Sequence, residues 1–305
     1  MRDLWRGNAN AWECDELGHL NVKFYLAKAM EAVAHLAQGA GMTAPFRGGA
    51  TATLLLREVH INFLAEARPG APLVIRGGFT SLDENSCQAA LVMEHGDGRP
   101  AAGLTLRLDH AVPTSGQVFP WPSRFADMAR QVLISPPEPC SPRGLPPHPG
   151  RPNVSLKAAD QIGLTEIGRG AFSPADCDVF GFLRPEGLLA KVSDSVIHFR
   201  EAFPEEWDSQ SGNGESLGGA LLEGRIRARG RPRAGDLFVI RSGLVEANPN
   251  VRRLVHWVLD PVSGQPWWTT EGVAAMLDLK ARRIRKMEDE RLSALRAVCR
   301  KDLAG

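Results

Sequence analysis

An aspartate and a glycine stand just before a segment with helical character, in the run Asp15-Glu16-Leu17-Gly18-His19. The first N–H groups of a helix have no partner within the helix and carry the positive end of its dipole. They can therefore polarise a carbonyl group and hold the oxyanion that forms when it is attacked. A carboxylate a few residues upstream can reach the same carbon as a nucleophile or through an activated water, and Gly18 permits the tight turn between them. This spacing suits acyl transfer without a serine or a metal.

The skeleton of this stretch occurs twice in the chain. At an offset of 163 positions, the matching pairs include Cys14 and Cys177, Asp15 and Asp178, Gly18 and Gly181, Lys28 and Lys191, and His35 and His198. At an offset of 165 positions, further pairs are Glu58 and Glu223, Ile61 and Ile226, Gly70 and Gly235, and Arg76 and Arg241. Registers held over such lengths predict two copies of one unit, with two positions inserted between the helix and the strands of the second copy.

Length and composition limit the class of protein. The 305 residues carry a formal net charge of +1, which fits two domains of ordinary size and gives no support for nucleic acid or a membrane surface as the main partner. The five scattered cysteines have no zinc-binding spacing and indicate reduced thiols, so Cys14 and Cys177 are interpreted as space-filling residues rather than nucleophiles. No apolar run resembles a signal peptide or a membrane span, and we therefore expect a cytoplasmic protein.

The first half of the chain reads as one strand, one long helix and four further strands. The helix is predicted over Asn21 to Ala40, where the polar residues Lys28, Glu31, His35 and Gln38 recur at three- and four-residue steps and form one wet stripe on a mostly buried helix. The strands are expected at residues 4–13, 52–64, 72–81, 86–94 and 101–110. The class is therefore α+β, with a strongly curved antiparallel sheet wrapped around the helix.

The second half repeats this order after a proline-rich connection. The expected organisation is an N-terminal domain at 1–115, a connection at 116–153 with a short helix over 121–133, a C-terminal domain at 154–281 and a charged helix at 282–305. Within the second domain, the expected elements are a strand at 164–172, a helix at 185–203, a polar loop at 208–216 and strands at 220–229, 237–245, 251–259 and 266–279.

The motif from Asp15 to Asn21, with Tyr25 beyond it, resembles the Asp-x-x-Gly-His-(Val/Leu)-Asn…Tyr signature of the 4-hydroxybenzoyl-CoA thioesterase-like hotdog family. The segment from Glu58 to Ile75, with its Arg-Pro-Gly turn, resembles the strand, turn and next strand of that family. The likeness covers nearly all of residues 5–112 and, more faintly, 160–280. It implies two tandem hotdog domains, a substrate that is an acyl-CoA or an acyl carrier protein thioester, hydrolysis of that thioester, and no cofactor. A metal site at the pair Glu31 and His35 is rejected because the sequence offers no third or fourth ligand of suitable type.

The resemblance also assigns roles. Asp15 would be the catalytic carboxylate, with His19 beside it and Asp178 as its counterpart in the second copy. Backbone N–H groups around Val22 to Tyr25 would be the oxyanion donors, and the substrate-binding set would comprise Gly18, Asn21, Val22 and Tyr25. The second copy departs from the signature, with Phe182, Arg184 and Leu188 in place of His19, Asn21 and Tyr25. Since hotdog sites generally form between two facing units, the chain would be an intrachain pseudo-dimer, with a further homodimer left open, and we expect the Asp15 site to dominate.

Each of these residues also has a structural alternative. Asp15 could be a turn former, and Asn21 a helix cap. His19 could orient the turn or help to protonate the leaving thiolate, and Tyr25 fits a pocket wall better than an acid. Glu31 lies four residues before His35 and is interpreted as part of an i,i+4 polar pair, although in another hotdog branch a helix glutamate is catalytic and keeps it as a rival to Asp15.

Three arginines, Arg225, Arg227 and Arg229, alternate with smaller residues and therefore project from one face of a strand. Guanidinium groups suit the phosphate groups of CoA. The alternative is a solvated face of the sheet paired with neighbouring acids. The CoA interpretation predicts that CoA thioesters are preferred over pantetheine thioesters and that the preference fades with salt.

Three functions are weighed. Hydrolysis of an acyl-CoA thioester comes first, with Asp15 as base or nucleophile. A hotdog hydratase or dehydratase comes second, but its typical Asp-x-Asn-Pro-x-His sequence is found in neither copy. A non-catalytic acyl-CoA-binding protein is third, favoured by the loss of signature residues in the second copy.

Overall fold

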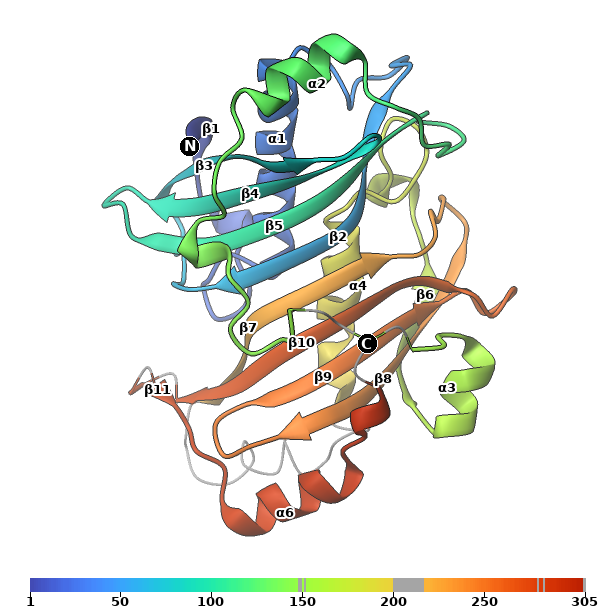
Figure 1. Ribbon diagram of the computed structural model, residues 1–305. Coiled ribbons are helices and arrows are strands. Elements are labelled where there is room, and N and C mark those ends of the chain that lie inside the picture. The colour runs from blue at the N-terminus through green and yellow to red at the C-terminus, as the bar shows by residue number, and fades with distance from the viewer. Residues whose placement is uncertain (148–149, 151, 200–216, 279, 282, 304–305) are drawn as a thin grey trace. The chain divides into compact units, whose positions relative to one another are not determined.

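The computed structural model describes residues 1–147, 150, 152–199, 217–278, 280–281, 283–303 of the chain (Figure 1). The chain divides into two compact units, one made of Met1–Pro142 with Pro174–Leu189 and the other of Arg143–Ser173 with Ala190–Gly305. The turn that carries Asp178 therefore groups with the first unit, as the Asp15 turn does. No helix in the described ranges is long and apolar enough to cross a membrane.

The first unit is an antiparallel sheet with one long helix against it. The strand order is β1, β3, β4, β5, β2, and the strands span Arg2–Asn8, Pro72–Leu82, Ser86–His95, Pro100–Ala111 and Thr53–Phe63 respectively. Helix α1 (Val22–Gly39) packs against β1, β3 and β4. Its apolar side chains Leu26, Val33 and Leu36 are almost completely buried, which drives the packing of helix on sheet. The predicted order of elements and the α+β class are confirmed.

The prediction of a solvent-exposed polar stripe on α1 is wrong at one position. Glu31, His35 and Gln38 are exposed, but Lys28 is only 5% exposed. Its ammonium group lies 2.8 Å from both carboxylate oxygens of the buried Glu13 and 5.0 Å from the centre of the Trp5 ring. A buried charge needs such a partner, and Glu13 reaches Lys28 because the chain folds back before α1 begins.

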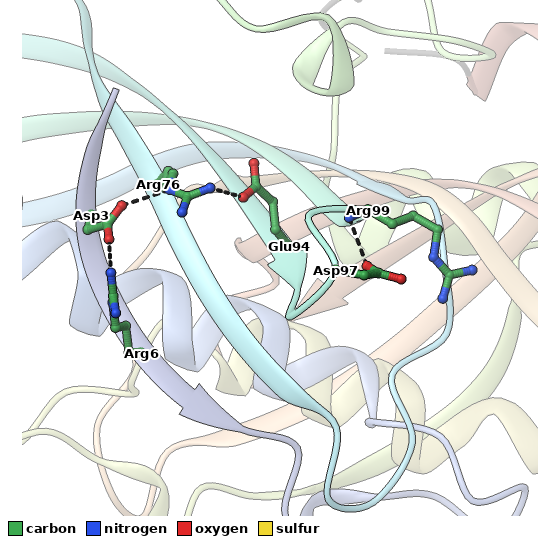
Figure 2. Close-up of polar contacts among 6 residues, drawn as sticks. All are labelled: Asp3, Arg6, Arg76, Glu94, Asp97 and Arg99. Carbon is green, nitrogen blue, oxygen red and sulfur yellow. Dashed lines mark hydrogen bonds and ion pairs between the residues drawn. The ribbon is translucent and has the colours of Figure 1, made fainter.

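Strand β1 is an edge strand, tied to its neighbours by a chain of ion pairs that Figure 2 shows. Asp3 pairs with Arg6 on the same strand and, at 2.7 Å, with Arg76 on β3, and Arg76 also pairs with Glu94 on β4. The hydrogen bonds from Arg6 and then Arg76 hold the pKa of Asp3 below its usual value. Strand β1 ends at Asn8, earlier than predicted, because residues Ala11–Glu13 form a 3₁₀ turn in which Glu13 accepts the Asn10 N–H.

The second unit repeats the pattern. The strand order is β7, β10, β9, β8, β6, and the strands span Leu217–Ala228, Pro266–Asp278, Arg252–Leu259, Leu237–Ala247 and Thr165–Ala171 respectively. Helix α4 (Gly187–Ser195) continues as a 3₁₀ turn at Val196–His198. The predicted end of this helix at 203 and the predicted loop at 208–216 lie outside the described residues. Helix α3 (Leu156–Ile162) and the turn Lys301–Leu303 add residues to a core cluster with Val239, Val255 and Trp257.

The C-terminal segment differs from the single helix expected. Arg283–Ile284 form a short strand, β11, paired with β10, and helix α6 spans only Asp289–Val298. The pairing of Leu277 with Ile284 extends the sheet, and the helix therefore begins only at Asp289. The short helix expected after the first unit is present as α2 (Ser123–Arg130).

Parts of the proline-rich connection are held by buried polar side chains of the sheets. In the first unit, the Asn62 amide donates to the carbonyl oxygens of Pro139 and Ser141. In the second unit, the carboxylate of Glu223, 2% exposed, accepts N–H groups from Arg143, Gly144 and Leu145. Glu223, the second copy of the repeated glutamate, thus binds three successive backbone amides.

Candidate active site

The Asp15 turn is a closed loop ahead of α1. Residues Cys14 and Leu20 form an antiparallel bridge, the Asp15 N–H donates to the His19 carbonyl at 2.8 Å, and the Gly18 N–H donates to the Asp15 carbonyl at 3.0 Å. Gly18 has φ +74°, a backbone conformation that residues with a Cβ rarely adopt. The glycine is therefore needed for the turn itself.

The Asp15 carboxylate has two different oxygens. Oδ1 accepts the N–H groups of Leu17 and His19, each at 3.0 Å, so one oxygen shapes the turn. Within the described ranges, Oδ2 makes no hydrogen bond. Turn formation and a chemical role are thus compatible, because they use different atoms.

One backbone donor remains available where α1 begins. The side chain of Asn21 caps the helix by accepting the Lys23 N–H at 3.1 Å, and the Asn21 carbonyl accepts the Phe24 N–H at 2.9 Å. The Asn21 N–H itself donates to the Glu13 carbonyl at 2.9 Å. In the part of the chain that the structure describes, the N–H of Val22 has no acceptor. Of the candidate oxyanion donors at Val22–Tyr25, the Lys23 and Phe24 N–H groups are thus engaged by Asn21, which acts as the cap, and the Val22 N–H is the open donor at the first helical position.

His19 and Tyr25 lie beside the turn in different settings. The Nε2 atom of His19 is 3.1 Å from a carboxylate oxygen of Glu66. Tyr25 is buried, with its ring edge-on to Phe63 at 5.2 Å. Burial raises the pKa of the Tyr25 phenol to about 12, so it stays protonated at neutral pH and cannot act as a base there.

The second turn reproduces the first. Cys177 bridges Leu183, the Asp178 N–H donates to the Phe182 carbonyl at 2.7 Å, and Gly181 has φ +83°. The Oδ1 atom of Asp178 accepts the N–H groups of Phe180 and Phe182 at 2.8 and 3.0 Å. The repeated aspartate and glycine therefore build the same loop twice.

The residues after the second turn differ from those after the first. The position of Val22 is taken by Pro185, which has no N–H, and the position of Asn21 by Arg184. The next residue is Glu186, which lies 3.4 Å from the Arg184 guanidinium and adds a negative charge near the helix start. The second turn keeps the carboxylate but has no N–H at the position of Val22. The sequence repeat places Pro185 opposite Val22, so this difference could have been found from the sequence. Comparison of the signature side chains alone did not reveal it, because the group that is lost is a backbone N–H.

The arginines Arg225 and Arg227 on β7 and Arg229 just after it do not form one open basic face. Arg225 is 4% exposed and lies 4.0 Å from Glu271 on β10, which also binds Arg253 at 2.5 Å. Arg227 donates to the Gly150 carbonyl at 3.0 Å, and Arg229 is exposed. Of the three arginines, only Arg229 is exposed.

Among the described residues, no hydrogen bond joins Glu31 or His35 to the Asp15 turn. Glu31 instead accepts the indole N–H of Trp5 at 2.6 Å. Among the described residues, no group of three or more histidine, cysteine, aspartate or glutamate side chains is arranged to hold a metal ion.

A family model supplies the identification. The model of the thioesterase-like superfamily matches residues 9–130 and again residues 172–295. The chain belongs to this superfamily. The two matches begin just ahead of the two carboxylate turns, and the fold is a hotdog fold present twice. No curated protein sequence matches the chain.

Solved thioesterase structures share the double fold at low sequence identity. A provisionally described oleoyl thioesterase from Lactobacillus plantarum superposes with a TM-score of 0.66 at 10% identity, covering 93% of this chain and 96% of that one. A 12:0-ACP thioesterase from Umbellularia californica gives 0.66 at 10% identity, covering 88% and 92%. An acyl-ACP thioesterase from Bacteroides thetaiotaomicron gives 0.60 at 13% identity, covering 88% and 96%. At such identities the similarity of these structures supports the fold alone.

Proposed function

We propose that the protein hydrolyses acyl thioesters and that the first turn, with Asp15 and Val22, carries the reaction. The observation that supports this most is the division of labour at that turn. One oxygen of Asp15 holds the loop and the other has no hydrogen bond among the described residues, while the Val22 N–H stands without an acceptor at the start of a helix.

These groups suffice for hydrolysis by water. Asp15 Oδ2 takes a proton from a water whose oxygen attacks the thioester carbon, and the carbonyl oxygen becomes an oxyanion that accepts the Val22 N–H and faces the positive end of α1. Collapse of the tetrahedral intermediate breaks the carbon–sulfur bond. The proton on Asp15 then passes to the thiolate, giving a free acid and a free thiol.

His19 acts in this proposal as a positioning residue. Its backbone N–H donates to Asp15 Oδ1, and its ring is directed to Glu66. The Asp178 turn is proposed to be inactive or much weaker, because Pro185 removes the donor that Val22 supplies.

The substrate class is proposed as an acyl-CoA or an acyl carrier protein thioester. Two of the similar structures are named as ACP thioesterases, and the exposed Arg229 suits a phosphate of either carrier. CoA thioesters and acyl carrier protein thioesters share the phosphopantetheine thioester, so both belong in the assay.

The direct experiment measures thiol release from a panel of acyl-CoA and acyl carrier protein thioesters of different acyl length. The wild-type chain is compared with the double variant Asp15→Asn/Asp178→Asn, in which the amide oxygens can still accept the turn N–H groups but cannot take a proton. We expect turnover by the wild type and background rates for the double variant. Equal rates for the two proteins would overturn the proposal.

A further inference from the structure

The second unit contains a cavity of about 450 Å³ between strand β6 and helix α4. Its lining includes Gly168 and Arg169 on β6, Lys191 and Asp194 on α4, and Phe238 on β8. The volume is within the range of small-molecule sites, and its walls combine an aromatic ring with charges of both signs. The thioesterase chemistry proposed above does not use this cavity.

The equivalent place in the first unit is filled by Trp5. Trp5 pairs with Ile75 and Gly168 pairs with Ile240, each directly after a register shift in the edge strand, so the two residues occupy one position of the repeat. The Trp5 indole donates its N–H to Glu31 at 2.6 Å, and the Lys28 ammonium lies 5.0 Å from the centre of a Trp5 ring. The cavity is thus found where the first unit holds an indole.

The second unit keeps the polar groups that surround this indole. Lys191 stands at the position of Lys28, and Asp194 at the position of Glu31. The ion pair of Asp3 with Arg6 (Figure 2) is repeated by Glu166 and Arg169. The two units differ in what fills the space between these groups.

Gly168 cannot fill the cavity, and a larger residue there is blocked. A Cβ on Gly168 would collide with the hydroxyl oxygen of Ser195, which donates to the Lys191 carbonyl at 2.9 Å. The corresponding residue in α1 is Ala32, which leaves room for Trp5. A Cβ built on Gly170 would lie 3.0 Å from the Phe238 ring, and one built on Gly7 would lie 2.5 Å from the Trp5 ring. Phe238 therefore forms a wall at the end of the space next to Gly170.

We infer that the second unit binds a planar bicyclic heteroaromatic molecule with an N–H donor, in the place that Trp5 occupies in the first unit. The ring packs beside Phe238 under the Lys191 ammonium, and its N–H donates to the Asp194 carboxylate. The inference stands on the repeat and the cavity, and it holds whether or not the protein hydrolyses thioesters.

Isothermal titration of the full chain with indole tests this site. We expect saturable binding of one indole per chain. The variant Gly168→Trp with Ser195→Ala installs the residues of the first unit and fills the cavity, so its indole affinity should fall at least tenfold. The matched control Val262→Trp adds a tryptophan at a side chain that is 82% exposed and should bind indole as the wild type does. Absence of saturation, or undiminished binding by the filled variant, would overturn the inference.

A second titration keeps the test decisive if the filled variant does not fold. 1-Methylindole has the same ring without the N–H donor, and the wild type should bind it about tenfold more weakly than indole. In Asp194→Ala the two ligands should bind equally, because the acceptor is gone. Equal binding of the two ligands by the wild type would contradict the assigned contact with Asp194.

Discussion

The two carboxylate turns have the same backbone hydrogen bonds but differ in the N–H groups that follow them. Both close through a Cys–Leu bridge, both place glycine at positive φ, and both use one aspartate oxygen to accept two N–H groups. They differ at one position of the repeat: Val22 is the first residue of α1 and offers an N–H, whereas its counterpart Pro185, two residues before α4, has none. The second copy therefore keeps the loop without the Val22 donor, and the presence of its aspartate and glycine is no evidence of activity there.

Among substitutions that copy a feature of one unit into the other, the largest expected effect comes from converting the first helix start into the second. Val22→Pro removes one N–H and nothing else of substance, because proline is favoured at the first helical position and Asn21, at φ −62° and ψ 141°, already has the extended conformation that precedes proline. We expect kcat to fall by about 10²–10³, the usual loss for one oxyanion donor. Val22→Ala keeps the N–H and serves as the control in the same thiol-release assay. Equal activity of the proline and alanine variants would remove Val22 from the mechanism.

A second comparison concerns one pair of facing residues in the two sheets. The first unit pairs Gly77 with Leu91, and the second pairs Ser242 with His256, whose side chains are hydrogen-bonded at 2.7 Å. Burial lowers the pKa of His256 from 6.5 to about 4. The imidazole is therefore neutral in the folded protein, whereas the unfolded chain takes up a proton below pH 6.5.

The unfolding free energy should consequently fall as the pH drops from 6.5 towards 4, by about 3 kcal/mol over that window, and His256 should contribute no pH dependence above it. Denaturant unfolding at a series of pH values measures this. The double variant Ser242→Gly/His256→Leu copies the first unit and should lose that part of the pH dependence. An unchanged slope in the variant would assign the effect to other groups.

A smaller effect is expected from the helix cap Asn21, whose position in the second copy is taken by Arg184. Asn21→Ala removes the acceptor for the Lys23 N–H and should lower the unfolding free energy by about 1 kcal/mol. Asn21→Ser keeps an acceptor and should restore most of the loss. Thermal unfolding followed by circular dichroism distinguishes the two, and equal stabilities would mean that the cap contributes nothing.

The smallest effect concerns Arg229, which is exposed where Arg225 is buried. Arg229→Gln should raise KM for acyl-CoA by no more than a few-fold, because exposed charge pairs contribute less than about 1 kcal/mol, and the difference from the wild type should vanish at high salt. Steady-state kinetics with acyl-CoA and acyl-pantetheine provide the readout. A loss that persists at high salt, or appears equally with pantetheine, would exclude phosphate binding by Arg229.

Periodicity in the sequence was enough to predict the sheets and α1, because burial enforces a period of two in strands and near 3.6 in helices. It failed for Lys28, whose partner Glu13 is brought close by the turn and not by the helix. It also placed the last helix too early, since pairing of Ile284 with Leu277 depends on contacts between segments. The N–H of Val22, which has no acceptor among the described residues, belongs to the backbone, so residue types indicate it only indirectly, through the proline in the other copy.

The account rests on the difference between the two turns, and one pair of substitutions tests it directly. Asp15→Asn and Asp178→Asn each keep the accepting oxygen of the loop and remove the base, so stability should be equally little changed. In thiol release from the preferred acyl thioester, we expect Asp15→Asn to lower kcat by about 10²–10⁴ and Asp178→Asn to leave it within about twofold of the wild type. The reverse result, or equal losses in both variants, would contradict the account.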